Sequence, residues 1–314
     1  MNDPDIAILI VSYNAAGVLP ACLDSLPAGA AGLSSETIVV DNASTDDSVT
    51  VLRERYPQIR LFANPQNVGF AAANNQAAAA ARARYLLLLN PDTVVRPGAL
   101  RALVTCAEAH PQAGTLGPRL LNADGTPQRS CWRGFPGLGM ALADALYLWK
   151  LPGLPLARGA EYRPSELTDT REVDHLLGAA LLVSRALWEQ LGGLDSSYFL
   201  FLEETDWCYR AQRAGRPSYF TPEAVIVHLG EHSMRQNPRR NLPQFYRSYC
   251  QFYRKHHTPG LIRRALLKAI IAAAAIVRLA LWGWRRLRRP GAARAQARAM
   301  QAGYAQVLVQ LPSF

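Results

Sequence analysis

Short runs of consecutive apolar residues recur through the first 230 positions, separated by longer segments with helical spacing of apolar residues. Such runs, lacking alternation, are typical of strands buried on both faces of a sheet. The predicted strands are Ile6–Val11, Thr37–Val40, Ile59–Ala63, Tyr85–Leu89 and Ala224–Val227, and Leu176–Val183 is either a strand or a helix start. The predicted helices are Val18–Leu26, the segment from Ser44 through Arg55, Phe70–Arg82, Pro97–Ala109, Ser184–Leu191 and Glu204–Ala214. This alternation predicts an α/β fold with a mostly parallel sheet flanked by helices.

Polar side chains follow three of the predicted strands. Ser12-Tyr13-Asn14 follow the first, Asp41 and its neighbours follow the second, and Asn90-Pro91-Asp92 follow the fourth. Pro91 has no N–H for a sheet ladder, so the strand ends before it. Because parallel strands end at one edge of a sheet, these groups are expected to open on one site.

The carboxylates at this edge suit a nucleotide and a cation. Asp41 can accept a hydrogen bond from a base N–H or a ribose hydroxyl. Asp92 and His228, which follows the last predicted strand, suit a divalent cation that holds a diphosphate. The alternatives are that Asp92 only caps the next turn and that His228 is a hydrogen-bonded, partly buried histidine.

Two further segments carry candidate chemistry. Asn67-x-Gly69, with Asn74 in the alanine-rich helix behind it, favours phosphate or sugar hydroxyls at a helix start, or is a simple cap and turn. Three carboxylates, Glu203, Glu204 and Asp206, stand within four residues after an apolar run, and like charges so close raise one another's pKa. One of them could act as a base, or all three could be an acidic helix start.

The charge is divided unevenly along the chain. Residues 1–234 carry 18 Lys and Arg against 24 Asp and Glu, a net charge of −6, whereas residues 235–314 carry 16 Lys and Arg and no acid. We therefore expect a globular domain over 1–235 and a basic, helical region over 236–314. A region so basic must meet an anionic membrane surface, a nucleic acid or the domain itself.

The cysteines and the N-terminus indicate a cytoplasmic protein. Five cysteines, odd in number and without a C-x-x-C pair, argue against a disulfide framework or a zinc knuckle. The first residues are acidic and are followed by only six apolar residues, so no signal peptide is predicted.

The basic region contains a candidate membrane helix. Residues 261–289 are apolar with interspersed cations, and at 100° per residue these cations, Arg278 included, fall within an arc of about 160°. The apolar core, Ala269–Trp284, is 16 residues long, whereas a spanning helix needs roughly 20. We expect a helix in a membrane interface with Trp282 and Trp284 as anchors. A helix packed on the domain and a short tilted span are the alternatives.

The order of these motifs resembles the family 2 glycosyltransferases, which have the GT-A fold, and in particular bacterial rhamnosyltransferase-like members that build surface polysaccharides. The resemblance covers roughly residues 5–235. It rests on Val11–Asn14, Val40–Asp46, Asn67–Ala71 with Asn74, Leu89–Asp92, Gly178–Ala179, Phe201–Cys208, and His228 with Ser233.

The resemblance implies a nucleoside-diphosphate-sugar donor, a divalent metal (Mn²⁺ or Mg²⁺) and inversion at the anomeric carbon. Asp41 would hold the base, Asp92 and His228 the metal, and Glu204 would be the catalytic base with Asp206 as the fallback. The implied donor-binding set is Ser12, Tyr13, Asn14, Asp41, Asn67, Gly69, Asn74, Asn90 and Asp92. The implied acceptor-binding set is Gly178, Ala179, Glu203 and Trp207. Trp207 and Tyr198 could stack on sugar rings or pack in the core.

Two residues depart from the family pattern. Asn90 cannot supply the first charge of the family's D-x-D motif, and Glu204 stands where relatives usually carry Asp. The expected partners are the donor, a glycan or polyprenyl-linked acceptor and an anionic membrane surface at the inner face of the cytoplasmic membrane. A non-catalytic nucleotide-binding scaffold and a basic nucleic-acid-binding protein are the alternatives, although no zinc spacing or recognition motif supports the latter.

Overall fold

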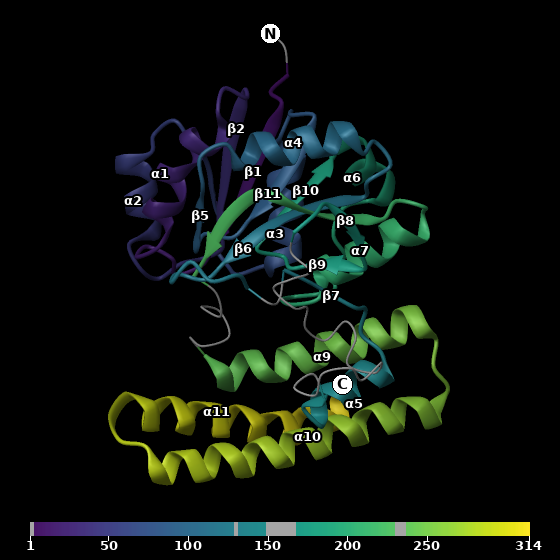
Figure 1. Cartoon of the computed structure of the whole chain (residues 1–314). Helices are drawn as coiled ribbons and strands as arrows, with labels where there is room; N and C mark the ends of the chain where they lie inside the picture. Colours follow the sequence, from purple (N-terminus) through teal and green to yellow (C-terminus); the bar gives the residue numbers. More distant parts are fainter. Residues whose placement is uncertain (1–2, 129–130, 149–167, 230–236) are drawn as a thin grey trace. The chain divides into compact units, whose positions relative to one another are not determined.

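The structure is a computed structural model of the 314-residue chain, and it describes residues 3–128, 131–148, 168–229 and 237–314 (Figure 1). Ser233 and much of the irregular segment 117–172 lie outside these residues. The described residues form two compact units. The first takes residues up to 133, 168–199 and 203–229, and the second takes 134–148, 200–202 and 237–314.

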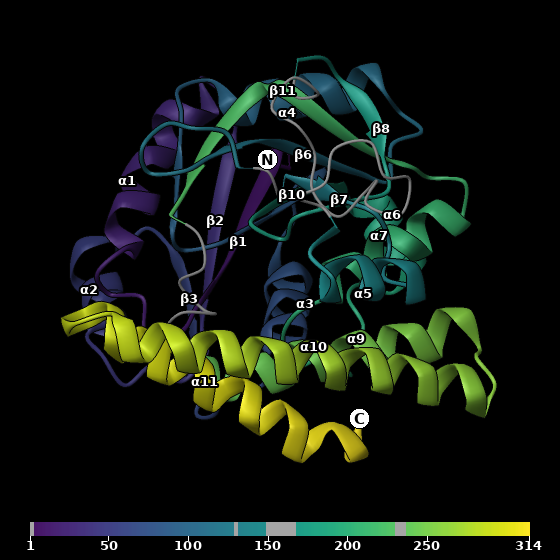
Figure 2. The same cartoon turned by 60° about the horizontal axis from the view of Figure 1, so that its bottom comes forward.

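The first unit is built around a mixed sheet (Figures 1 and 2). Among the described residues it has nine strands in the order β3-β2-β1-β4-β10-β6-β11-β5, with β8 paired to β11. They are β1 (Ile6–Ser12), β2 (Ser35–Asp41), β3 (Arg60–Ala63), β4 (Tyr85–Leu89), β5 (Thr93–Val95), β6 (Thr115–Leu121), β8 (Arg171–Val173), β10 (Ala180–Ser184) and β11 (Ser218–His228). A separate pair joins β7 (Trp132–Arg133) to β9 (His175–Leu176).

The half of the sheet from β3 to β4 is parallel, as the apolar runs predicted. All seven residues of β1 and all five of β4 are buried, which explains why they lack polar alternation. The chain runs from β1 to β2 and β3 on one side and then places β4 on the other side of β1. Strand order therefore reverses between β1 and β4, where open α/β sheets bind ligands.

The other half of the sheet is mixed. β10 runs antiparallel to both β4 and β6, and β11 is antiparallel to β5 and β8. Sequence patterns missed β5, β6 and β8 for physical reasons. β5 and β8 have three residues each, and Gly117 and Pro118 interrupt the apolar run of β6.

Helices cover the sheet of the first unit. They are α1 (Leu19–Ala30), α2 (Ser48–Arg55), α3 (Phe70–Ala80), α4 (Ala99–Ala109), α6 (Arg185–Leu191) and α7 (Glu203–Arg213). The alanines of α3 let it pack closely on β1 and β2, and α7 brings its acidic first turn beside β9. These bounds lie within a few residues of the predicted helices.

The second unit is helical. Its helices are α5 (Leu138–Ala145), α9 (Pro238–His257), α10 (Leu261–Arg288) and α11 (Gly291–Gln310). α11 packs on both α9 and α10, and α5 packs on α10. By length and composition α10 is the one helix among the described residues that could cross a membrane, with a mean hydropathy of 2.0 in its most apolar window.

Arg278 corrects the sequence-based view of α10. It was expected among the outward-facing cations, but its side chain is only 6% exposed. Its guanidinium donates to the carboxylate of Asp144 at 2.9 Å and to the backbone oxygen of the same residue at 2.8 Å. It also lies over the rings of Tyr147 and Tyr304. Arg278 therefore fastens α10 to α5 and α11 instead of reaching solvent.

Candidate functional site

The strand ends at the switch point form a continuous row. Ser12 is in register with Asp41, and the N–H of Asn90 donates to the oxygen of Ala179 at 2.9 Å. Next to Ala179, Gly178 lies against Glu204, since a Cβ on this glycine would come within 3.2 Å of Glu204 Cγ. The row from β2 through β1 and β4 to β10 spans about 14 Å at ordinary strand spacing. The predicted donor and base residues are thus brought to one edge of one sheet.

The loops after β1 and β2 are bound to each other. Asp41 is 2% exposed and accepts from both the N–H and the hydroxyl of Ser44, at 2.9 and 2.6 Å. Asn14, at φ 51°, accepts from the N–H of Thr45, while its own N–H donates to Ser44 Oγ. Tyr13 is the exposed member of the group at 39%. The Asp41 carboxylate is therefore held in a fixed place at the strand end.

Asn42 joins this edge to the start of α3, a role that the sequence did not indicate. Its amide is buried, accepts from the N–H of Val68 at 3.0 Å, and donates to Asn67 Oδ1 at 2.9 Å. Asn67 Oδ1 also accepts from the N–H of Gly69. The predicted sugar contact of Asn67 is therefore an organising contact of the loop in this structure.

Gly69 is required by a close approach of protein backbone. It has φ +90°, and a Cβ there would lie 2.7 Å from the carbonyl oxygen of Phe199. The N–H of Phe70 donates to that same oxygen at 2.8 Å. Backbone of the segment that leads to α7 occupies the space where a side chain at position 69 would lie. Gly69 therefore allows the start of α3 to pack against this segment.

Two predicted donor residues are buried with unpaired polar atoms. The hydroxyl of Ser12 and the side-chain oxygen of Asn74 have no hydrogen-bond partner, although Asn74 Nδ2 donates to the oxygen of Phe70. Both side chains are at most 1% exposed. Unpaired buried polar atoms are uncommon in proteins and often mark functional sites.

Asp92 and His228 meet at the far side of the edge. β5 pairs with β11, and Asp92 Oδ1 lies 3.5 Å from His228 Nε2. Both residues are 7% exposed. If one ion bound two ligand atoms at about 2.1 Å each and at a right angle, those atoms would lie about 3 Å apart. The 3.5 Å between Asp92 Oδ1 and His228 Nε2 is close to this value, so the two side chains could bind one cation. Among the described residues no three His, Cys, Asp or Glu side chains gather.

Gln128, which the sequence did not indicate, fixes the tautomer of His228. Its Nε2 donates to the backbone oxygen of His228 at 2.7 Å, so its Oε1 must be the atom 3.1 Å from His228 Nδ1. An amide oxygen only accepts, and Nδ1 therefore carries the proton. Nε2 is the ring nitrogen that faces Asp92.

We predict that Gln128→Leu weakens Mn²⁺ affinity in the presence of nucleoside diphosphate by about 10- to 100-fold, because His228 then samples both tautomers. Titration with Mn²⁺ measures the loss, and ¹⁵N shifts of the His228 ring report the tautomer directly. Gln112→Leu, at an exposed amide bonded to Tyr219, is the matched control. An unchanged His228 tautomer in Gln128→Leu would contradict this role.

The acidic start of α7 contains two carboxyl groups in different surroundings. Glu203 is 4% exposed with one oxygen unpaired, and burial together with the neighbouring Glu204 charge raises its pKa well above the usual range. Glu204 is partly exposed. Burial raises its pKa as well, although hydrogen bonds and the Arg133 charge act against the shift. Glu204 is thus the accessible member of the pair.

The structure corrects three expectations about this segment. Asp206 is fully buried and pairs with Arg210 at 2.8 Å, so it is not placed to accept a substrate proton. Trp207 is 1% exposed, donates to Thr115 Oγ1 at 3.0 Å and stacks near Trp188, so it belongs to the core and not to an acceptor surface. Tyr198, a second candidate for stacking on sugars, is also fully buried.

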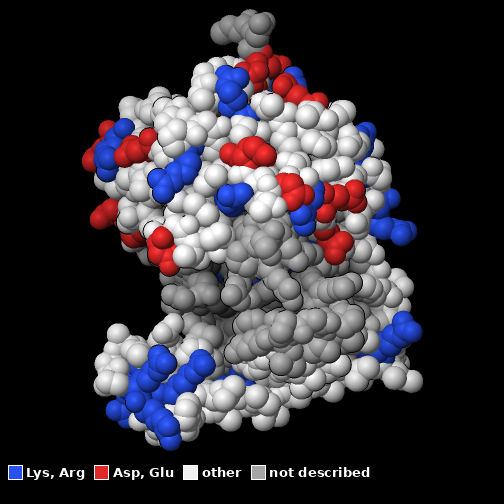
Figure 3. All heavy atoms as spheres, viewed as in Figure 1, with Lys and Arg blue, Asp and Glu red and all other residues white. Residues whose placement is uncertain are grey.

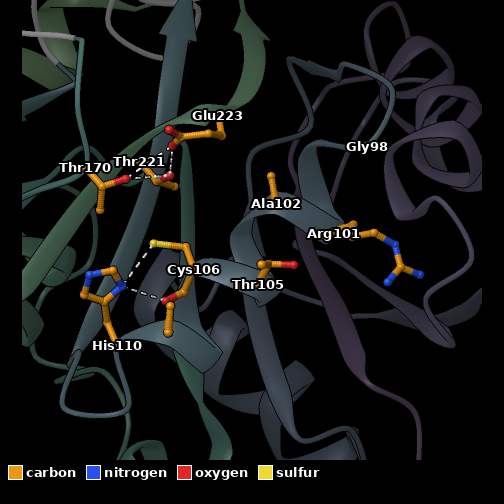
Figure 4. Close-up of a pocket in the computed structure, with 10 residues that line it drawn as sticks. Gly98, Arg101, Ala102, Thr105, Cys106, His110, Thr170, Thr221 and Glu223 are labelled. Atoms are coloured by element: carbon orange, nitrogen blue, oxygen red, sulfur yellow. Dashed lines mark hydrogen bonds between the residues drawn. The ribbon is translucent and has the colours of Figure 1, made fainter.

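A separate pocket of about 420 Å³ lies between α4 and β11 (Figure 4). Its walls include Arg101, Cys106, His110 and Glu223, and none of its lining residues belongs to the predicted site. The Glu223 carboxylate is occupied by Thr170 and Thr221, and burial raises the pKa of the Cys106 thiol. The pocket is therefore distinct from the site at the sheet edge.

Comparison with known proteins agrees with this geometry. Residues 7–136 match the description "Glycosyl transferase family 2". The chain is 31% identical over 235 residues, 70% of its length, to the N-acetylglucosaminyl-diphospho-decaprenol L-rhamnosyltransferase of Mycobacterium tuberculosis, and covers 75% of that protein. The chain belongs to family 2 of the glycosyltransferases. It is therefore a glycosyltransferase of glycan or polysaccharide biosynthesis.

A further relative and a solved structure are also similar to this chain. The low-salt glycan biosynthesis hexosyltransferase Agl10 of Haloferax volcanii is 29% identical over 67% of this chain, which covers 62% of that protein. The mannosyltransferase PcManGT from Pyrobaculum calidifontis, solved with GDP-Man and Mn²⁺, matches 99% of this glycosyltransferase and 88% of its own chain, with a TM-score of 0.55 and 17% identity. At that identity the match shows the shared GT-A fold.

Proposed function

We propose that this glycosyltransferase moves a sugar such as rhamnose from a nucleoside-diphosphate donor to a hydroxyl of a glycan or lipid-linked acceptor, with inversion and with the help of a divalent metal. The observation that carries the proposal is the row from Asp41 through Ser12 and Asn90 to Gly178 and Glu204 at the switch point. The likeness to the decaprenol-linked rhamnosyltransferase supports the sugar and the acceptor class.

The donor would lie along this row. Asp41 would accept from the base or the ribose, and the loop anchored by Asn14 and Asn42 would hold its position. Asp92 would stand near the diphosphate at the end of β4. Such a placement puts the anomeric carbon toward β10, where Glu204 lies in the first turn of α7.

Glu204 would then act as general base. Its carboxylate takes the proton of the acceptor hydroxyl while that oxygen forms a bond to the anomeric carbon. The bond from this carbon to the diphosphate oxygen breaks on the opposite face, and the nucleoside diphosphate leaves with the electron pair. Burial raises the pKa of Glu203 well above its usual range, and Glu204 is the more accessible of the two carboxyl groups.

Asp92 and His228 are the residues that would hold the metal. One carboxylate and one imidazole suit Mn²⁺ better than Mg²⁺, and the contact of Gln128 with Nδ1 leaves Nε2 as the ring nitrogen on the side of Asp92. The ion, when bound, would offset negative charge on the leaving diphosphate. Two solved structures with this fold contain Mn²⁺ together with a nucleotide or nucleotide sugar.

A lipid-linked acceptor would place the enzyme in the cytoplasm, at the inner face of the membrane. The basic region after residue 235 would then be its membrane contact.

Thermal unfolding with UDP, dTDP and GDP, each with and without Mn²⁺, tests the donor site. We expect one nucleotide to raise the melting temperature only with the metal, since ligand at 100 times its dissociation constant adds about 2.7 kcal/mol. The matching nucleotide sugar should then give a product whose anomeric configuration, measured by NMR, is inverted. No shift with any nucleotide, or a product with retained configuration, would contradict the proposal.

A further inference from the structure

An exposed apolar stripe runs the length of α10. At 100° per residue, Ile262, Leu266, Ile276, Val277, Trp284 and Leu287 fall within an arc of about 100°, with alanines between them. Ile262 is 86% exposed, Ile276 56% and Leu287 79%. Eight of the 14 large hydrophobic side chains that are exposed among the described residues belong to this one helix. A concentration of this kind marks a contact surface.

The opposite side of α10 is already occupied. Leu267, Ile271, Ala274, Ala275 and Arg278 are buried, and the helix packs there on α11 and α5. The ion pair of Arg278 with Asp144 is part of this packing. The stripe is therefore the free side of a helix that is held by its other side.

The cations of α10 lie at its two ends. Arg263, Arg264 and Lys268 are near the start, and Arg285, Arg286, Arg288 and Arg289 are near the end, while Arg278 between them is buried. On the face seen in Figure 3, the described surface of the helical unit shows Lys and Arg gathered at the α10–α11 turn. The two cation groups are separated by about 25 Å of helix. A partner must therefore offer an apolar layer for the stripe and anionic groups that the cations at both ends of the helix can reach.

A single membrane leaflet with anionic lipids has these properties. We infer that α10 lies in the plane of such a leaflet, with its stripe among the acyl chains and its terminal arginines on the lipid phosphates. The helix does not span, because a span would pull Arg278 away from Asp144 and expose it to lipid. The inference rests on the proposed function only for the choice of membrane, and vesicle binding without substrate tests it separately from sugar transfer.

Flotation of the full-length protein with vesicles of phosphatidylcholine, with and without phosphatidylglycerol, is the first test. We expect binding that needs the anionic lipid and weakens in high salt. Ile276→Glu should lower the partition coefficient by about tenfold or more, because a charge replaces an apolar side chain in the middle of the stripe. Val309→Glu, at a 72% exposed position of α11, is the matched control and should bind like the parent.

Depth measurement separates a helix in the plane from a span. All five native cysteines are buried, so Ile262→Cys, Ile276→Cys and Leu287→Cys can each be labelled selectively with an environment-sensitive dye. Lipids brominated at known depths should quench all three positions equally if α10 lies flat. A deep middle with shallow ends would show a span and overturn the inference.

Two other results would also overturn it. One is equal binding of the parent and Ile276→Glu to anionic vesicles. The other is no vesicle binding together with a dimer in solution that Ile276→Glu separates, which would show that the stripe joins two copies of the chain. Loss of sugar transfer in a variant that still floats would count against the proposed function alone.

Discussion

Glu204→Gln removes sugar transfer and leaves donor binding intact. The change keeps the size and the hydrogen-bonding shape of the side chain beside Gly178 but takes away its ability to accept a proton. General-base catalysis contributes about 10²–10⁴-fold, so kcat should fall by that factor. The metal-dependent thermal shift with the nucleotide should match that of the parent, because Glu204 would face the acceptor and not the diphosphate.

Two further variants serve as controls for Glu204→Gln. Glu204→Asp keeps a carboxylate at this position and should retain much of the rate. Glu189→Gln alters an exposed helical glutamate that pairs with Arg185 and should transfer sugar normally. Turnover by Glu204→Gln within a few-fold of the parent would refute Glu204 as the base.

The pH profile of the parent enzyme follows from the same residue. Only the carboxylate form of Glu204 accepts a proton, and burial raises its pKa above the ordinary value of 4.5. The rate should therefore fall on the acid side at a higher pH than an exposed glutamate would give. This acid limb should disappear from the small residual rate of Glu204→Gln.

The strand ends could be predicted from the sequence because apolar runs fix where buried strands stop. Asp41 and Asn90 follow such runs directly, and the parallel pairing of β1 with β2 and β4 brings those ends together. The pairing of Asp92 with His228 was a hypothesis from residue types and strand ends, because the pairing of β5 with β11, which brings them together, joins segments more than 130 residues apart.

Side-chain direction within the acidic helix could not be predicted. Glu203, Glu204 and Asp206 look alike in the sequence, yet the turn of α7 points Asp206 to Arg210 in the core and leaves Glu204 accessible. The charge pattern also gave a wrong prediction for Arg278, which was expected to face outward. Its partner Asp144 lies in a segment whose sequence shows no clear pattern. The contacts of Asn42 and Gln128 depend on loops that only the folded chain brings together.

Asp92→Asn should abolish the metal-dependent part of nucleotide binding. Asn90 already lacks a charge in this loop, so Asp92 is its only carboxylate, and His228 is neutral when it offers Nε2. Removing the last negative charge leaves two neutral ligands, which bind a hard dication poorly. We expect Mn²⁺ affinity with nucleotide to fall by at least about 100-fold, more than for the outer contact of Gln128.

Mn²⁺ titration followed by electron paramagnetic resonance measures this loss without relying on turnover. Asp24→Asn makes the same change at an exposed position of α1 bonded to Tyr56, and it should bind Mn²⁺ like the parent. Asn90→Asp gives the opposite test, because a second carboxylate in the loop should tighten Mn²⁺ binding if the ion lies there. Unchanged affinity in both Asp92→Asn and Asn90→Asp would exclude this loop as the metal site and would leave the diphosphate to be held by the protein alone.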